Sequence, residues 1–208
     1  LYEFVLKLIR KNQAGGLSST EFQYHWNDSQ AAYQDDLLGR FQAMNTGKTG
    51  PNTGLLENET ILQKLSPFTK PSTINIIDGS IEKPSDFIYR LALRINGVDV
   101  YKINQNQIAT VNANVIDPPS VNDDKYYFVE YEDYYYILPN TLPTVDITSA
   151  ELDYISTVTN IVWGYTFEAN GKQVYNAGTS VQPLWDSNSC REITKRMLKN
   201  LGVSFKDR

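Results

Sequence analysis

The chain has 208 residues, 41% hydrophobic and 21% charged, which is typical of a globular protein with one large domain or two small ones. The net charge of −5 argues against a surface that grips nucleic-acid phosphates, although DNA could still slide past it. No apolar run approaches the roughly 18 residues of a membrane span. No signal peptide is visible, although the start at Leu1 leaves a removed leader open. The one cysteine, Cys190, excludes an intramolecular disulfide.

The best-specified element is a long helix that begins near Ser18. Ser18 and Glu21 have the spacing of a capping box, and Leu17 and Phe22 have that of a hydrophobic staple. The helix should end at residues 40–44. Apolar residues recur at helical spacing and form a stripe, in which Ser29 is the one small residue: Phe22, Trp26, Ser29, Tyr33, Leu37 and Phe41.

The residues on either side of this helix predict a hairpin before it and a loop after it. Leu1, Phe4, Val5 and Leu8 give a second amphipathic stripe, which is broken by two glycines, so two helices should fold back on each other. Residues 45–54 form a polar loop. The Gly47-Lys48-Thr49 sequence in it is no phosphate-binding loop, because it follows a helix and lacks the first glycine at Gln42.

The middle of the chain changes to a period of two. Residues 87–95 alternate as a half-buried strand does, and Asn96-Gly97 predicts a type I′ turn into a second strand. Another hairpin is expected at residues 126–138, around Glu132-Asp133. Strands are also expected at 154–158 and 161–167. Residues 104–115 carry no clear pattern.

The last element should be a helix with a second capping box, made by Ser189 and Glu192. Gly202 is well placed as the residue after its C-cap, with Val203 packing back on Leu198 in a Schellman motif. The apolar stripe consists of Cys190, Ile193, Met197 and Leu201.

These elements together predict an α+β fold. An N-terminal helical hairpin and a C-terminal helix should form one helical layer, with an antiparallel β-rich portion between them. The expected divisions are a hairpin at 1–44, a loop connector at 45–72, a β-rich body at 73–185, and a final helix and tail at 186–208.

Few residues suggest chemistry. His25 is the only histidine and has no motif partner, so packing or surface exposure is the simpler interpretation, and one His with one distant Cys makes no zinc site. Carboxylates flank the tyrosines of residues 126–136, and such an arrangement could bind or hydrolyse sugars. A solvated loop and an exposed hairpin tip explain the same pattern, and we favour that explanation.

Several segments, in this order, resemble neck proteins of crAss-like and related Bacteroidetes phages. The resemblance covers nearly the whole chain in scattered pieces. It departs from the family at 157–160, where a Pro-rich segment is expected, and at 181–185. The matching pieces are residues 12–18 (NQAGGLS), Glu21-Phe22, Asn27, Gln30, 65–68 (LSPF), 83–87 (KPSDF), 163–165 (WGY), Asn170-Gly171, Tyr175-Asn176, Ser180, Ile193, Leu198 and 201–203 (LGV).

The resemblance implies a virion structural protein that forms a ring at the head-to-tail junction, docks beneath the portal and leaves a channel for DNA. Such proteins carry no catalytic residues, metal or cofactor and form rings expected to be dodecameric. The expected partners are other copies, the portal, further neck or tail rings and passing DNA, with no membrane. The alternative is a carbohydrate-binding or glycan-active tail component. Aromatic residues expected at interfaces are Trp26, Tyr33, Tyr126, Tyr134, Tyr135, Trp163, Tyr165, Trp185 and Phe205.

Overall fold

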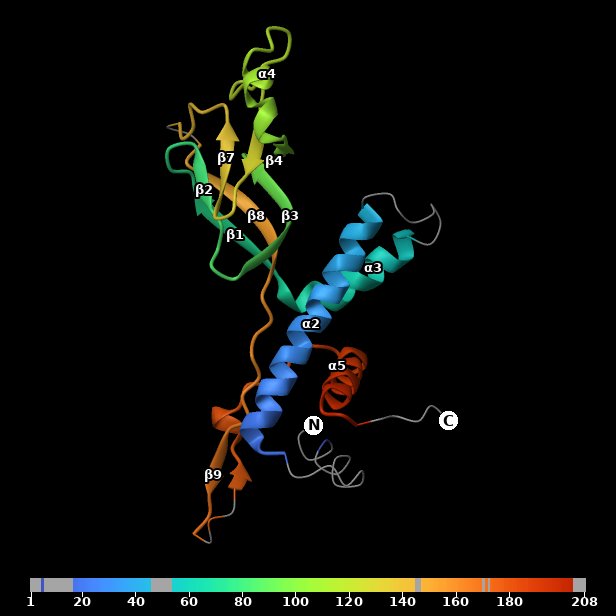
Figure 1. Cartoon of the computed structure of the whole chain (residues 1–208). Helices are drawn as coiled ribbons and strands as arrows, with labels where there is room; N and C mark the ends of the chain where they lie inside the picture. Colours follow the sequence, from blue (N-terminus) through green and yellow to red (C-terminus); the bar gives the residue numbers. More distant parts are fainter. Residues whose placement is uncertain are drawn as a thin grey trace. The chain divides into compact units, whose positions relative to one another are not determined.

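The computed structural model describes residues 5, 17–45, 54–144, 147–169, 171 and 173–203. They form an α+β protein, as predicted, with long helices towards both ends and antiparallel sheets in the middle (Figure 1). The chain divides into two compact units. Unit 1 contains Leu1–Pro67 and Val158–Arg208, and unit 2, Phe68–Thr157, is inserted between them.

Unit 1 is built on helix α2 (Ser19–Asn45). Its predicted capping box is present: the Ser18 amide donates to the Glu21 carboxylate over 2.8 Å, and the Glu21 amide donates to the Ser18 hydroxyl over 3.2 Å. The hydrogen bonds from Ser18 lower the pKa of Glu21. The predicted stripe from Phe22 to Phe41 is buried. No helix among the described residues, the long α2 included, is apolar enough to cross a membrane.

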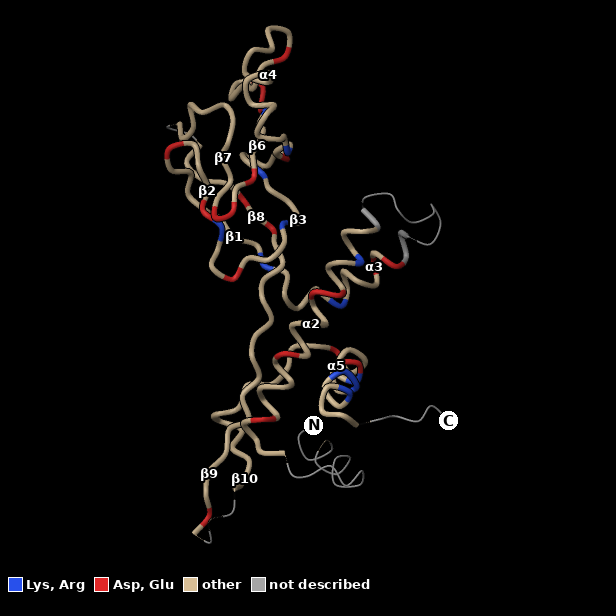
Figure 2. The backbone as a smooth tube through the Cα atoms, viewed as in Figure 1, with Lys and Arg blue, Asp and Glu red and all other residues tan. Residues whose placement is uncertain are grey.

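Two further helices pack on α2. They are α3 (Gly54–Leu65) and α5 (Ser187–Asn200). Tyr33 of α2 shares a hydrogen bond of 3.3 Å with Ser189 of α5, and its ring lies edge-on to Trp185 at 5.2 Å. Arg196 of α5 donates to Asp36 over 2.6 Å. Figure 2 shows basic residues gathered in α5 and acidic residues recurring along α2.

The cap of α5 differs from the prediction. Asp186 is the N-cap, and its carboxylate accepts from the amides of Ser189 (3.1 Å) and Asn188 (3.3 Å). The hydrogen bonds from Ser189 also lower the pKa of Asp186. Ser189 is a buried residue of the first turn, so the predicted Ser189–Glu192 capping box is wrong. The Asp186 carboxylate, three residues before Ser189, already accepts from the amides that are free at the start of the helix.

The C-terminus of α5 agrees with the prediction. Gly202 has φ +77°, the left-handed conformation that a Schellman motif requires. Its amide donates to Lys199, and the Val203 amide donates to the Leu198 carbonyl over 2.9 Å. Val203 and Leu198 are both buried.

The returning chain of unit 1 lies along α2 and then forms a small hairpin. Strands β9 (Tyr165–Phe167) and β10 (Gln173–Tyr175) pair in a two-stranded antiparallel sheet. The predicted strand at 161–167 is therefore shorter. Before it, side chains of α2 hydrogen-bond to the backbone of Thr159 and Ile161, and Val162 forms only an isolated bridge to Val181.

Unit 2 consists of two four-stranded sheets. The first has the order β1 (Thr69–Asn75), β8 (Ser149–Ser156), β3 (Phe87–Ile95), β4 (Val98–Asp99). The second has the order β2 (Ser80–Glu82), β7 (Tyr134–Leu138), β6 (Tyr127–Glu130), β5 (Tyr101–Lys102), in which only β5 and β6 are parallel. The short helices η2 (Gln105–Gln107) and α4 (Ile108–Asn112) occupy the segment that had no assignment.

One hydrophobic core joins the two sheets of unit 2. Ile81, Phe128 and Ile137 come from the second sheet, and Leu93 and Leu152 come from the first. All five side chains are buried. Since each sheet buries one face against the other, the unit has the layered arrangement of a sandwich.

Both predicted hairpins of unit 2 are present. Asn96 and Gly97 have φ values of +53° and +75°, as a type I′ turn demands. The alternation predicted for β3 holds only at its end, where Leu93 and Ile95 are buried. Two register irregularities interrupt its first half, and the guanidinium of Arg90, predicted to face outward, lies 4.6 Å from the centre of the buried Phe128 ring.

Two of the predicted divisions need correction, and a third lies partly outside the described residues. The range 45–72, expected to be a loop, contains the helix α3 and the start of β1. The β-rich body ends at Thr157 and not at 185, because the later segment belongs to unit 1. The hairpin predicted at 1–44 involves Leu1, Phe4 and Leu8, which lie outside the described residues.

Replacing the cap residue should destabilise unit 1. Asp186→Ala removes the acceptor of two helix amides and should lower the free energy of unfolding by about 1 kcal/mol. All three tryptophans lie in unit 1, so urea unfolding followed by tryptophan fluorescence measures this change. The control Glu192→Ala removes only an exposed pair with Lys195 and should cost about 0–1 kcal/mol. A larger loss for Glu192→Ala than for Asp186→Ala would contradict the assignment.

Candidate interaction surfaces

Five of the nine aromatic residues predicted at interfaces are core residues. Their side chains are buried within their own unit and cannot reach a partner without unfolding, so the prediction is wrong for them. The helical or alternating spacing that drew attention to them is the spacing of the core face. These residues are Trp26, Tyr33, Tyr126, Tyr135 and Trp185.

The hydroxyl groups of the two buried tyrosines of unit 2, Tyr126 and Tyr135, are also inaccessible to a partner. Burial, together with the hydrogen bond to Asp124, raises the pKa of Tyr126 to about 12. Burial also raises the pKa of Tyr135, whose hydroxyl has no hydrogen-bond partner in the described part of the chain. Neither phenol is available to a saccharide or another protein.

An exposed apolar surface lies on the hairpin β9–β10 and the residues beside it, and is called here the hairpin surface. Phe167 is 65% exposed and Leu184 is 53% exposed. Trp163 packs on Tyr175 with ring centres 4.6 Å apart, and Tyr165 packs on Phe167 at 5.5 Å. The exposed hydrophobic residues of this surface are Val162, Tyr165, Phe167, Val174, Tyr175, Val181 and Leu184.

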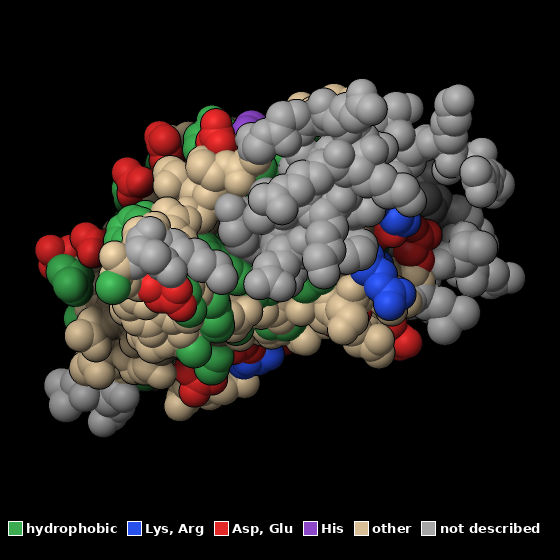
Figure 3. Space-filling model, turned by 90° about the horizontal axis from the view of Figure 1, so that it is seen from below, with side chains coloured by type: hydrophobic (Ala, Val, Ile, Leu, Met, Phe, Trp, Pro, Cys, Tyr) green, Lys and Arg blue, Asp and Glu red, His purple; other side chains and the backbone are tan. Residues whose placement is uncertain are grey.

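Sequence reasoning found only part of the hairpin surface. It identified Trp163 and Tyr165, which are half-buried and exposed respectively, but missed Phe167, Tyr175 and Leu184. The signal was present as alternation over residues 162–167, but nothing in it told which face would be covered. The space-filling view in Figure 3 shows exposed hydrophobic side chains beside acidic ones on the face it presents.

A tight backbone contact fixes the base of the hairpin surface. The Gly164 amide donates to the Ser180 hydroxyl over 2.9 Å, and the Gly164 carbonyl accepts from the Asn176 amide over 2.9 Å. A β-carbon at position 164 would lie 2.6 Å from the Thr179 carbonyl carbon, so only glycine fits. The loop 176–180 therefore orients the hairpin from one side.

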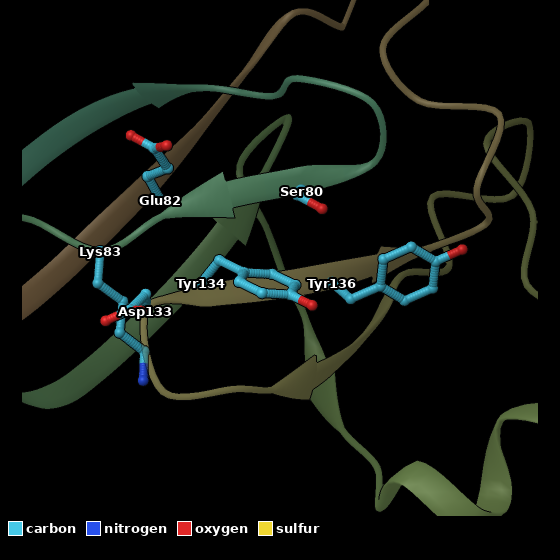
Figure 4. Close-up of a pocket in the computed structure, with 6 residues that line it drawn as sticks. All are labelled: Ser80, Glu82, Lys83, Asp133, Tyr134 and Tyr136. Atoms are coloured by element: carbon cyan, nitrogen blue, oxygen red, sulfur yellow. The ribbon is translucent and has the colours of Figure 1, made fainter.

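Unit 2 carries an open pocket of about 550 Å³ on the outer face of β2 and β7. Glu82 pairs with Tyr134 and Ser80 with Tyr136 across the two strands, so the four side chains share one face. Figure 4 shows the two tyrosines side by side along β7, with Asp133 and Lys83 at the end of the strand. This face is polar and aromatic, and Tyr134 is the part of the predicted interface set that borders it.

Lys83 at the pocket edge holds the β6–β7 hairpin closed. Its ammonium donates to the carbonyls of Tyr131 (2.7 Å) and Glu132 (3.1 Å) and to the Glu130 carboxylate (3.3 Å). It also lies 4.9 Å from the centre of the Tyr135 ring. Burial of Glu130 raises its pKa, but the bonds to Lys102 and Lys83 outweigh this effect and the pKa is lowered overall.

The described residues offer contact surfaces and no assembled reactive group. His25 is half-buried and packs against Tyr24, with ring centres 5.3 Å apart. Burial raises the pKa of the Cys190 thiol, which favours its unreactive form. No cluster of three or more His, Cys, Asp or Glu residues that could hold a metal exists in the ranges described. Phe205, the remaining predicted interface residue, lies outside them.

Comparison of the chain with known protein families and with curated proteins found no match. Its function is therefore inferred from the surfaces described above and from the phage resemblance of the sequence. The hairpin surface and the pocket face both present aromatic side chains at the surface.

Removing the Lys83 ammonium should destabilise unit 2. Lys83→Met leaves the carbonyls of Tyr131 and Glu132 without this donor and Glu130 with Lys102 alone, which should cost about 2 kcal/mol. The matched control is Lys102→Met, because Lys102 binds the same Glu130 but its side chain is 51% exposed. Its loss should cost about 0–1 kcal/mol.

Hydrogen exchange of peptides covering β6 and β7 distinguishes the two variants. Faster exchange is expected in Lys83→Met and near wild-type exchange in Lys102→Met. Equal effects of both substitutions would mean that Lys83 contributes no more than an exposed ion pair.

Proposed function

We propose that the protein is a ring-forming head-to-tail connector of a phage virion, which docks on the portal and forms part of the DNA channel. Support comes from the ordered resemblance of the chain to neck proteins of crAss-like phages. The helical unit 1 is suited to the wall of a ring, and its hairpin surface is suited to contact with a neighbouring protein. The protein acts by assembly and not by catalysis.

The observation that carries this proposal is the hairpin surface. A two-stranded sheet is marginally stable alone in water, and its two strands are too short to bury their own side chains. Phe167 and Leu184 are nevertheless more than half exposed. A concentrated apolar surface of this kind is typical of a site that another protein covers.

The helices of unit 1 suit the role of a rigid wall. α2 has 27 residues, a capping box at its start and a buried aromatic face. α5 has an N-cap and a Schellman motif. A ring needs two different surfaces on each copy, one for each neighbour, and unit 1 with several exposed helix faces can provide them.

A channel wall that lets DNA pass must not bind the DNA strongly, so its charge matters. The net charge is −5, and a channel wall that is neutral to negative lets DNA slide without sticking. A continuous belt of Lys and Arg facing the channel in an assembled particle would contradict this part of the proposal. Residues 204–208, expected to form an arm onto a partner, lie outside the described residues.

The protein, alone or added to portal rings, should form closed rings with the symmetry of the portal. Native mass spectrometry gives the copy number, and class averages from electron microscopy show the ring. The decisive observation is the position of the protein at the neck of an intact particle. A chain that stays monomeric at every concentration and does not bind portal rings would contradict the connector role.

Changes in the hairpin surface should weaken attachment without unfolding the chain. Phe167→Ser and Leu184→Ser replace exposed side chains, so the free energy of unfolding should change by no more than about 0.5 kcal/mol. Binding to the partner ring, measured by co-sedimentation, should fall. Ile116→Ser is the control, because Ile116 is an exposed apolar residue that belongs to unit 2 and not to the hairpin surface. Unchanged binding by both hairpin variants would remove the proposed role of this surface.

One observation favours a second function, saccharide binding by unit 2. The pocket face has two neighbouring tyrosines with Glu82 and Asp133 beside them, and sugars bind to aromatic rings flanked by carboxylates. Asp123 and Asp124, two of the carboxylates that flank the tyrosines of residues 126–136 in the sequence, do not border the pocket.

Tyr134→Ala should abolish any saccharide binding detected on a glycan array or by calorimetry. Tyr101→Ala is the matched control, because it removes an exposed tyrosine from the strand at the far edge of the same sheet. An empty glycan screen with the wild-type chain would dismiss this function.

A further inference from the structure

We infer that copies of this chain associate through two oppositely charged helix faces of unit 1, the acidic face of α2 and the basic face of α5. The acidic face consists of Tyr24, Asp28, Ala31 and Asp35. The basic face consists of Arg191, Lys195 and Lys199. This inference rests on the proposed function, in which copies of the chain stand side by side in a ring.

The acidic face is the side of α2 opposite its core stripe. All four residues are exposed, and Tyr24 is 70% exposed. Asp28 and Asp35 are seven residues apart, which is two helical turns, so they lie on one line about 10.5 Å apart. Ala31 between them is small, so a second helix can approach closely along this line.

The basic face lies on α5 away from Ser189, the residue that contacts α2. Arg191, Lys195 and Lys199 are exposed and recur at i, i+4 and i+8, which puts them along one side of the helix. Arg191 and Lys199 are about 12 Å apart along the axis, a separation close to that of Asp28 and Asp35. Their long side chains can take up the difference.

Four of the five charged residues on the two faces have no counter-ion in the described part of their own chain. Within the described ranges, Asp28, Asp35, Arg191 and Lys199 form no ion pair. The fifth, Lys195 of the basic face, pairs with Glu192, and the neighbouring Asp36 binds both Arg40 and Arg196. The unpaired acids and bases thus form complementary lines on two different faces of the same unit.

Complementary faces on one chain identify a second copy as the occupant. Such an interface is heterologous, because the α2 face of one copy meets the α5 face of the next, and it propagates into a ring when the rotation closes. Opposite charges give it orientation and speed of encounter, and Tyr24 can supply its apolar anchor. Salt should weaken it, because exposed charges are screened.

Charge reversal tests this arrangement with the full chain. Asp28→Lys with Asp35→Lys makes both faces basic, and Arg191→Glu with Lys199→Glu makes both faces acidic. Each double variant alone should self-associate about 100-fold more weakly than the wild type, because like charges would meet at the interface. A mixture of the two should assemble with strict alternation of variants, which native mass spectrometry resolves by mass.

Two controls keep the result specific to these faces. The variant with all four changes has the wild-type net charge and complementary faces in reversed positions, so its association should return to near the wild-type level. Glu59→Lys with Glu132→Lys makes the same change of charge as Asp28→Lys with Asp35→Lys, but at exposed sites elsewhere, and should associate as the wild type does. Far-UV circular dichroism and tryptophan fluorescence establish that every variant is folded.

The outcomes separate this inference from the connector role. Sedimentation velocity is measured from low to several hundred micromolar protein, in low and in high salt. Normal rings from both double variants would overturn the inference and leave the connector role standing. Alternating assemblies that never bind a portal would support the inference and count against the role. A wild-type chain that remains monomeric throughout, or mixed variants that do not associate, would overturn the inference.

Discussion

The hydrogen bonds from Asn27 and Gln30 to the backbone of the returning chain are the interaction on which unit 1 depends. Asn27 accepts from the Ile161 amide over 2.9 Å and donates to the Ile161 carbonyl over 3.3 Å, as a neighbouring strand would. Gln30 donates to the side-chain oxygen (Oδ1) of Asn27 and to the Thr159 backbone carbonyl, both over 3.0 Å, so it also fixes the orientation of the Asn27 side-chain amide. Buried backbone groups need such partners. The chain that leaves unit 1 at Pro67 is thereby tied back to the helix it left.

Much of the helical part could be predicted because its signals are local. A capping box, an apolar stripe and a glycine after the last turn each depend on residues within a few positions of each other. The exception was Asp186, where two good N-cap residues lie three positions apart and sequence alone does not choose between them. Burial of Ser189 against Tyr33 decides it, and that contact joins residues far apart in the chain.

The interaction surfaces were harder to predict for a related reason. Aromatic residues at a regular spacing indicate a face of a helix or strand that is buried. The spacing does not reveal whether that face packs against the same chain or against a partner. For Trp26 and Tyr135 the cover is the chain's own core. For Phe167 the short hairpin leaves the side chain uncovered. The strand length that separates these cases follows from long-range contacts, and the alternation of residues 161–167 did not contain it.

The two kinds of exposed surface on unit 1 suit different contacts. The hairpin surface is apolar, so covering it gains free energy whatever the salt concentration and suits a permanent neighbour. The charged faces of α2 and α5 contribute more to orientation and rate than to affinity. In the proposed connector, a ring must first select the correct relative rotation of its copies and then hold that arrangement while DNA passes. In a chain with both surfaces, charge would set the order of the copies and the apolar hairpin would keep the assembled wall attached to its neighbour.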